Sequence, residues 1–125
     1  MITGIDHIEI VVRDLEDYVA FLTTLGFETV RRTDHHGGSV EMKPPGDGQP
    51  VFEIHQVSGE EVIGINHIAL KVDNATAAHE DLQKKGVAFS RGPKYIGVTG
   101  RTTVELRVPD GWRFQLVDAE RAAPE

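Results

Sequence analysis

Apolar and polar residues alternate in eight short stretches of the chain, and two other stretches carry apolar residues at helical spacing. Alternation with a period of two indicates a strand, whereas recurrence every three to four residues indicates a helix. The predicted strands cover residues 4–12, 27–33, 38–43, 51–57, 64–72, 87–96, 102–108 and 112–118. The first helix carries its apolar stripe from Leu15 to Leu25, and the second helix runs through Lys85. The pattern therefore predicts the order strand, helix, strand, strand, strand, twice in succession.

The two halves of this pattern are copies of each other. Residues 4–8 read Gly-Ile-Asp-His-Ile and residues 64–68 read Gly-Ile-Asn-His-Ile. The same offset places Leu22 on Leu82 and Gly26 on Gly86. Internal repetition of this kind indicates one structural unit used twice. We expect a single domain over residues 1–125, with module one at about 1–58 and module two at about 62–120.

Capping residues support both helices. Asp14 is a candidate N-cap of the first helix, and Asp73 or Asn74 is the candidate for the second. Gly26 and Gly86 follow the helices at the position where a left-handed backbone conformation ends a helix and glycine adopts it most easily. The two modules are thus expected to begin and end their helices in the same way.

Strand alternation also predicts which side chains share a face of the sheet. In residues 4–12, Ile8 and Ile10 share one face while His7 and Glu9 share the other. We expect the apolar face of each sheet to be covered by its own helix. The opposite face is polar, and its predicted members are His7, Glu9, Glu41, Lys43, Glu53, His55, His67, Lys71, Thr103, Glu105, Arg107, Arg113 and Gln115.

Two histidines occupy equivalent positions in the repeat, and this suggests a metal centre. If the two modules curve round together, their polar faces line a shared cleft in which His7, Glu53, His67 and Gln115 converge. Two imidazoles, one carboxylate and one amide oxygen suit a divalent first-row cation: Zn, Ni, Co, Mn or Fe(II). We predict one such metal per site, with His7 and His67 as ligands. His35, His36 and His79 fall in a turn or on a helix surface, and we assign them no role.

Composition narrows the function classes. The chain has no cysteine, so any metal uses histidine, carboxylate or amide ligands. The net charge of -7, without a basic cluster, argues against nucleic-acid binding. No apolar stretch is long enough for a membrane span, and the N-terminus has no signal-peptide pattern. We therefore expect a cytoplasmic protein with a small-molecule substrate and no nucleic-acid or membrane partner.

The quoted motifs resemble the vicinal oxygen chelate superfamily, which includes glyoxalases, bleomycin resistance proteins and extradiol dioxygenases. The resemblance covers nearly the whole chain, from the two Ile-(Asp/Asn)-His-Ile segments to the closing Pro-Asp-Gly-Trp-Arg-Phe-Gln-Leu at 109–116. It implies an α+β fold in which two tandem βαβββ modules form an eight-stranded cup with helices on the outer faces. It also implies metal ligands on the first and last strand of each module, at His7, Glu53, His67 and Gln115. The chain departs from the pattern at Gln115, where glyoxalase I, methylmalonyl-CoA epimerase and the extradiol dioxygenases carry glutamate.

The resemblance implies a lyase or isomerase of lactoylglutathione lyase or epimerase type. Such an enzyme moves a proton next to a carbonyl through a metal-bound enediolate. Glu53 is the leading candidate for the catalytic base, with His55 in reserve. Lys71, Arg107 and Arg113 are candidates for binding an anionic substrate. Relatives commonly pair chains to cover sheet edges, so we expect a homodimer.

Two other function classes remain open at this point. His7, His67 and Glu53 would also suit an Fe(II)-dependent, ring-cleaving dioxygenase-like oxygenase, which iron retention and oxygen uptake with a catechol would reveal. A metal-free small-molecule or antibiotic binding protein would rely on an aromatic-lined cleft. The chain has one Trp, two Tyr and five Phe and keeps both histidines, so this third class ranks last.

Overall fold

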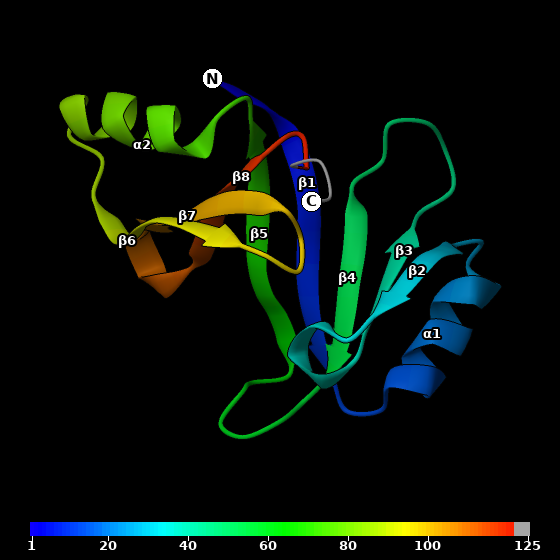
Figure 1. Cartoon of the computed structure of the whole chain (residues 1–125). Helices are drawn as coiled ribbons and strands as arrows, with labels where there is room; N and C mark the ends of the chain where they lie inside the picture. The colour runs from blue at the N-terminus through cyan, green and yellow to red at the C-terminus, as the bar shows by residue number, and fades with distance from the viewer. Residues whose placement is uncertain (122–125) are drawn as a thin grey trace. The chain divides into compact units, whose positions relative to one another are not determined.

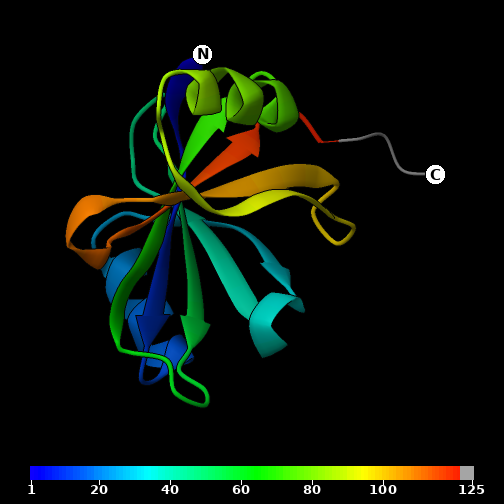
Figure 2. The ribbon, with the colours of Figure 1, turned by 90° about the vertical axis from the view of Figure 1, so that its left-hand side faces the viewer.

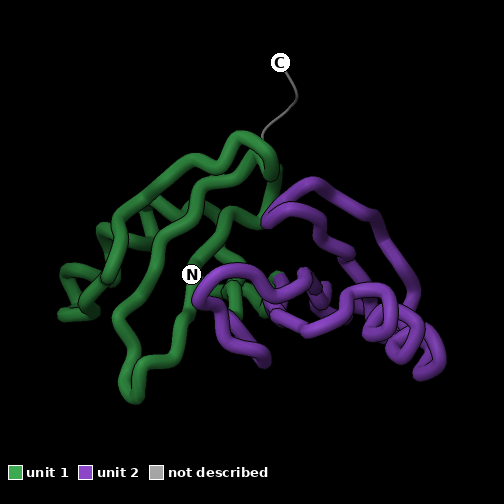
Figure 3. Tube along the Cα trace, turned by 90° about the horizontal axis from the view of Figure 1, so that it is seen from below, with its two compact units in different colours: residues 1–6, 67–125 green, residues 7–66 purple. Residues whose placement is uncertain are grey.

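The computed structural model describes residues 1–121, which divide into two compact units (Figures 1 and 3). Unit 2 comprises residues 7–66 and contains most of the first copy of the repeat. Unit 1 comprises residues 1–6 together with the chain from residue 67 onward, and contains most of the second copy. The first strand is thus divided between the units, because its first residues belong to unit 1. We describe each unit by itself.

The first βαβββ copy begins with β1 (Ile2–Val12) and α1 (Leu15–Thr24). Three strands follow: β2 (Glu28–Thr33), β3 (Ser39–Lys43) and β4 (Val51–Gln56), with the short turn η1 (His35–Gly37) before β3. The strand order in unit 2 is β2-β3-β4-β1, with β4 parallel to β1 and antiparallel to β3. Helix α1 covers one face of this sheet (Figure 1), and the core between them contains Ile10, Val12, Val19, Leu22, Val40, Met42 and Ile54.

Unit 1 repeats this arrangement with β5 (Gly64–Val72) and α2 (Ala75–Lys84). It continues with β6 (Phe89–Ile96), β7 (Arg101–Arg107), the short turn η2 (Pro109–Gly111) and β8 (Arg113–Asp118). The order is β5-β8-β7-β6, with β8 parallel to β5. Strands β6 and β7 form the long hairpin that is yellow to orange in Figure 2. The core contains Val72, Ala75, Ala78, Val104 and Leu116.

Both helices begin and end as the sequence predicts. The Asp14 side chain accepts a hydrogen bond from the backbone N–H of Asp17. Of the two candidate N-caps of α2, Asp73 and Asn74, the structure shows Asn74. Its side chain accepts a hydrogen bond from the backbone N–H of Ala77. Gly26 and Gly86 have φ of 97° and 89°, a left-handed conformation that other residues adopt at a cost.

The predicted fold class, α+β with two tandem βαβββ modules and eight strands, is confirmed. The strand bounds shift by one or two residues, and β1 starts at Ile2 rather than at residue 4. Near this start, the Thr3 hydroxyl donates to the Lys71 carbonyl oxygen in unit 1 at 3.4 Å. In the described part of the chain, neither helix is long and apolar enough to cross a membrane.

Candidate functional site

Three carboxylates lie side by side across the polar face of unit 2. Strand register places Glu9 of β1 beside Glu53 of β4, and Glu53 beside Glu41 of β3. Glu9 is only 1% exposed. On the far side of the row, the Arg31 guanidinium contacts Glu41 at 2.6 Å. The sequence predicts that these residues share a face, but it gives no indication of how deeply Glu9 is buried.

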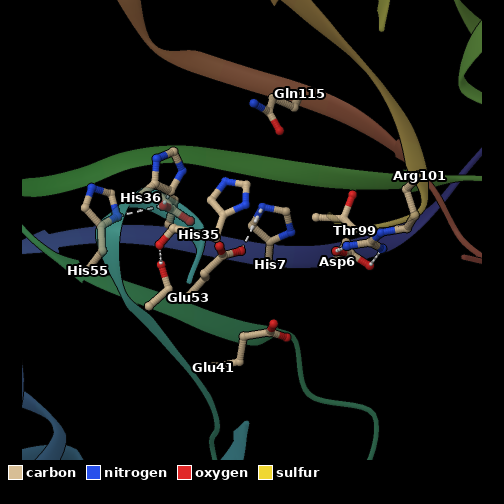
Figure 4. Close-up of polar contacts among 12 residues, drawn as sticks. Asp6, His7, His35, His36, Glu41, Glu53, His55, Thr99, Arg101 and Gln115 are labelled. Carbon is tan, nitrogen blue, oxygen red and sulfur yellow. Dashed lines mark hydrogen bonds and ion pairs between the residues drawn. The ribbon is translucent and has the colours of Figure 1, made fainter. Parts of the chain in front are cut away.

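His7 and Glu53 form the part of the predicted metal centre that belongs to unit 2 (Figure 4). His7 Nε2 and Glu53 Oε2 lie 3.9 Å apart, with side chains 11% and 17% exposed. Burial, followed by the charge of neighbouring Glu9, raises the pKa of Glu53 to about 7. Ligand atoms at about 2.1 Å from one metal lie roughly 3–3.5 Å apart, so these two donors fit a shared cation with a small side-chain movement.

His55 lies between two carboxylates. Its Nδ1 is 2.8 Å from Glu9 Oε1, and its Nε2 is 2.8 Å from Glu61 Oε2. The hydrogen bond to Glu9, reinforced by Glu61, raises the pKa of His55 to about 9 despite its burial. A protonated imidazole has no lone pair with which to accept a proton. His55 therefore lies between two hydrogen-bond acceptors and offers a lone pair only after it loses a proton.

His36 reaches the same group of side chains from the turn η1. Its Nε2 is 3.4 Å from Glu9 Oε1, and its ring stacks on that of His55 with centroids 4.6 Å apart. His35 packs edge-on against His36 at 4.0 Å (Figure 4). Burial lowers the pKa of His36. Sequence reasoning left both turn histidines without a role, although two consecutive histidines beside a polar strand face were a usable signal.

Unit 1 contributes His67 and Gln115 to the predicted ligand set. His67 is buried, with 7% exposure. The Gln115 amide nitrogen donates to Glu105 Oε1 at 3.2 Å, which assigns the other amide atom, the carbonyl oxygen, as the possible ligand. Burial raises the pKa of Glu105, but the hydrogen bonds from Gln115 and then Arg113 outweigh burial and lower this pKa below its usual value. Glu105 is therefore an ionised anchor for the Gln115 side chain.

The three basic side chains predicted to bind substrate lie in different environments. Arg113 forms an ion pair with Glu105 at 2.8 Å, and its side chain is 51% exposed. Arg107 is exposed, and Lys71 is half-buried on the same face of β5 as His67. Arg113 is thus held in place within unit 1, while Arg107 and Lys71 stay candidates by position alone.

Unit 1 also contains an ion pair that the sequence did not reveal. Both terminal nitrogens of Arg101 donate to Asp6, at 2.8 and 2.9 Å (Figure 4). The side chains are 10% and 13% exposed. Arg101 also donates to the backbone carbonyl of Asp118. Two parallel N–H···O bonds give both strength and fixed geometry, so this pair joins the first residues of β1 to β7.

Comparisons with known proteins identify the family of this chain. Residues 4–116 match the family described as the Glyoxalase/Bleomycin resistance protein/Dioxygenase superfamily. The chain belongs to this superfamily. A lactoylglutathione lyase of Salmonella typhimurium is 32% identical, with 93% of each chain covered.

Solved structures of epimerases share the fold. A methylmalonyl-CoA epimerase variant from Streptomyces coelicolor, in complex with 2-nitronate-propionyl-CoA, superposes with a TM-score of 0.75 at 25% identity. The match covers 99% of this chain and 100% of that one. The Mycobacterium tuberculosis methylmalonyl-CoA epimerase gives a TM-score of 0.76 at 21% identity, covering 98% and 90% of the two chains. With a lyase and epimerases among its relatives, the chain is an enzyme of the lyase/isomerase group.

Proposed function

We propose that this protein is a divalent-metal-dependent lyase or isomerase that moves a proton on a carbon next to a carbonyl. The proposed metal ligands are His7, Glu53, His67 and Gln115. One observation carries the proposal: both histidines are buried, at 9% and 7% exposure, on equivalent strands of a duplicated module. A histidine that only faced solvent would not need to be buried in both copies.

The donor set suits a first-row divalent cation. Each unit supplies one imidazole and one oxygen donor, and Zn, Ni, Co, Mn and Fe(II) all accept such a mixture. When bound, the cation would act as a Lewis acid that stabilises negative charge developing on a substrate oxygen. The superfamily pairs two such half-sites either within one chain or between two chains, and the proposal holds in both cases.

Glu53 is the proposed proton acceptor. General bases work best when their pKa lies near the operating pH, and burial beside Glu9 raises the pKa of Glu53 to about 7. Glu53 would act either as a ligand that detaches or as a neighbour of the metal. The fixed amide of Gln115 has no acid–base chemistry in this range, so the one carboxylate of the proposed set takes the proton.

The relatives suggest two substrate classes. The name of one relative, lactoylglutathione lyase, indicates a glutathione derivative. The Streptomyces coelicolor epimerase structure contains the coenzyme A derivative 2-nitronate-propionyl-CoA. Both classes are anionic thiol derivatives with a carbonyl beside the reacting carbon. Lys71 and Arg107 are the proposed contacts for their negative charges, because Arg113 already pairs with Glu105.

Metal content and a substrate panel test the proposal. We expect protein purified without added metal to retain a divalent cation, and chelation to abolish turnover that the same metal restores. The panel contains hemithioacetals, acyl-CoA epimers and catechols. Turnover of a catechol with oxygen uptake, and of neither thiol class, would replace the proposal with an oxygenase. Full turnover after complete metal removal would end it.

We further propose a homodimer, which light scattering at micromolar concentration tests directly. Mixing His7→Ala chains with His67→Ala chains then asks which chain supplies each half-site. Metal binding that appears only in the mixture would mean that half-sites of different chains share a metal. A monomer would contradict the dimer and require both half-sites to come from one chain.

A further inference from the structure

The buried Glu9–His55 pair has an apolar counterpart in the other unit. Glu9 lies beside Glu53 in the strand register, and Ala69 lies beside Gln115 in the same way. His55 lies opposite Val11, and Val117 lies opposite Lys71. Glu9 and His55 are each 1% exposed, and their counterparts Ala69 and Val117 are 0% and 1% exposed.

The duplicated fold does not require a buried ion pair at these strand positions. The same strand positions are filled in unit 1 by an alanine and a valine, which have no polar groups to desolvate. A buried ion pair is weak evidence for a role in stability, and the duplicated fold forms with an alanine and a valine at the positions of Glu9 and His55. Their chemistry therefore needs another explanation.

His36 completes a group of three ligand-type side chains. It lies in the turn η1 with φ of 53°, a left-handed conformation that a residue other than glycine adopts at an energetic cost. In that conformation its Nε2 is 3.4 Å from the Glu9 carboxylate and its ring stacks on His55. One ligand atom from each of Glu9, His36 and His55 lies within 4.8 Å of the others.

We propose that Glu9, His36 and His55 form a second divalent cation site, contained in unit 2 and adjacent to the His7–Glu53 half-site, since Glu9 lies beside Glu53 in the strand register. Two imidazole nitrogens and one carboxylate oxygen suit Zn²⁺ and its first-row neighbours. Ligand atoms on one tetrahedral Zn²⁺ lie about 3.4 Å apart, close to the separations of 2.8 and 3.4 Å from Glu9 to His55 and His36. Three protein donors leave the remaining coordination position to water.

Glu61 has the position of a supporting residue in such a site. Metal-bound histidines usually donate their second ring N–H to a carboxylate, which fixes the ring and makes it a better donor. Glu61 lies 2.8 Å from His55 Nε2, and its other oxygen accepts from the Ser58 backbone N–H at 3.0 Å. Cation binding would displace the proton that His55 Nδ1 shares with Glu9. With Nε2–H still donated to Glu61, the Nδ1 lone pair would then be directed to the Glu9 side, where the cation would bind.

A cavity borders this group at His36. It has a volume of about 470 Å³, and its lining residues are Leu15, His36, Gly37, Gly38, Gln56, Val57 and Ser58. The His36 side chain is 42% exposed, whereas Glu9 and His55 lie beneath it. An ion would therefore meet His36 first and then the buried carboxylate. Binding would attach the 35–38 turn to β1 and β4.

Metal titration in a protein without the first site tests the proposal. In a His7→Ala/His67→Ala background, we expect Co²⁺ or Zn²⁺ to bind with about one equivalent per chain. Adding His36→Asn should abolish this binding, because asparagine keeps the left-handed turn but lacks the imidazole. Adding Glu9→Ala/His55→Val, which copies unit 1, should also abolish it. Glu61→Gln should weaken it by about 10–100-fold.

Matched controls separate this site from its neighbours. His79→Asn removes a histidine that packs on Phe89 in unit 1 and should leave the titration unchanged. A site made instead by His35, His36 and Glu53 would survive Glu9→Ala/His55→Val, and that result would overturn the proposal. Thermal melting with a chelator present shows whether each variant is folded, and the exposed turn makes His36→Asn the safest of them.

The outcomes also distinguish this site from the proposed catalytic metal. Absence of binding in the His7→Ala/His67→Ala background would overturn the second site while leaving the first intact. Wild-type protein that binds a single equivalent, lost with His36→Asn and kept with His7→Ala/His67→Ala, would support the second site and refute the first. Two equivalents in wild type, with one lost by each set of changes, is the result we expect.

Discussion

The two units share a strand order and helix caps but place very different chemistry on their polar faces. Unit 2 carries Glu9, Glu53 and His55 where unit 1 carries Ala69, Gln115 and Val117. Unit 1 instead contains the largely buried ion pair between Asp6 and Arg101, which joins the start of β1 to β7. The two copies thus share their backbone fold and one histidine at equivalent positions, His7 and His67. The charged residues around these histidines differ between the copies.

The features that the fold requires are those that recur in both units. Apolar strand faces and helix ends recur in both units because the sheets cannot be covered without them. The carboxylate row of unit 2 does not recur as a whole, and only Glu41 has an acidic counterpart, Glu105. Burial, followed by the charge of Glu9, raises the pKa of Glu53 to about 7, whereas the Gln115 amide at the equivalent position has no titratable group. In the proposed mechanism, unit 2 would supply the proton acceptor.

The largest expected effect tests what the units have in common. His7→Ala and His67→Ala should each remove the catalytic metal, because they occupy the same place in the repeat and are buried to a similar degree. Elemental analysis of each variant against wild type gives the answer. If one variant kept full occupancy at every site, the histidines would not be equivalent and the proposed ligand set would be wrong.

Arg101→Met tests the charge that only unit 1 carries. Removing Arg101 takes two charge-assisted hydrogen bonds away from the largely buried Asp6 carboxylate, which should lower the free energy of unfolding by about 3–5 kcal/mol. Urea unfolding measures this change. The matched control is Arg32→Met, which breaks the exposed pair with Glu16 and should leave the unfolding midpoint nearly unchanged. Equal effects of the two variants would mean that burial of the Asp6–Arg101 pair contributes nothing.

Glu53→Gln makes unit 2 resemble unit 1 at the last strand. If Glu53 is the base, turnover should fall by about two orders of magnitude, in the range typical of a lost general base. His55→Ala should reduce turnover less, since His55 is held between Glu9 and Glu61. Steady-state kinetics on the substrate identified in the panel compare the two. A larger loss with His55→Ala would reverse the assignment.

Much of this structure could be predicted from the sequence, because local periodicity encodes it. Strand alternation places His7, Glu53, His67 and Gln115 on polar faces, and Asp14 and Gly26 mark the ends of α1. Contacts between distant residues have no such local signal. The Asp6–Arg101 pair joins positions far apart in the chain, and the approach of His36 to Glu9 depends on a left-handed turn.

The smallest expected effect concerns Gln115, the residue at which unit 1 differs from Glu53 of unit 2. A carboxylate donates more charge to a cation than an amide does, so Gln115→Glu should raise metal affinity by about tenfold, or roughly 1.4 kcal/mol. The structure adds an opposing effect. The Gln115 amide donates to Glu105, and a second carboxylate there would repel Glu105 until a metal binds.

Gln115→Glu/Glu105→Gln separates these two effects. The double change reverses the hydrogen bond, so that an amide at 105 donates to a carboxylate at 115, and it removes the repulsion. Metal titration should then show higher affinity in the double variant than in Gln115→Glu alone, and both should exceed wild type. Glu105→Gln by itself keeps an amide oxygen that can accept from the Gln115 amide, so it should change affinity less than Gln115→Glu does. Unchanged affinity in every variant would mean that the Gln115 side chain does not contact the metal and only hydrogen-bonds to its neighbour on β7.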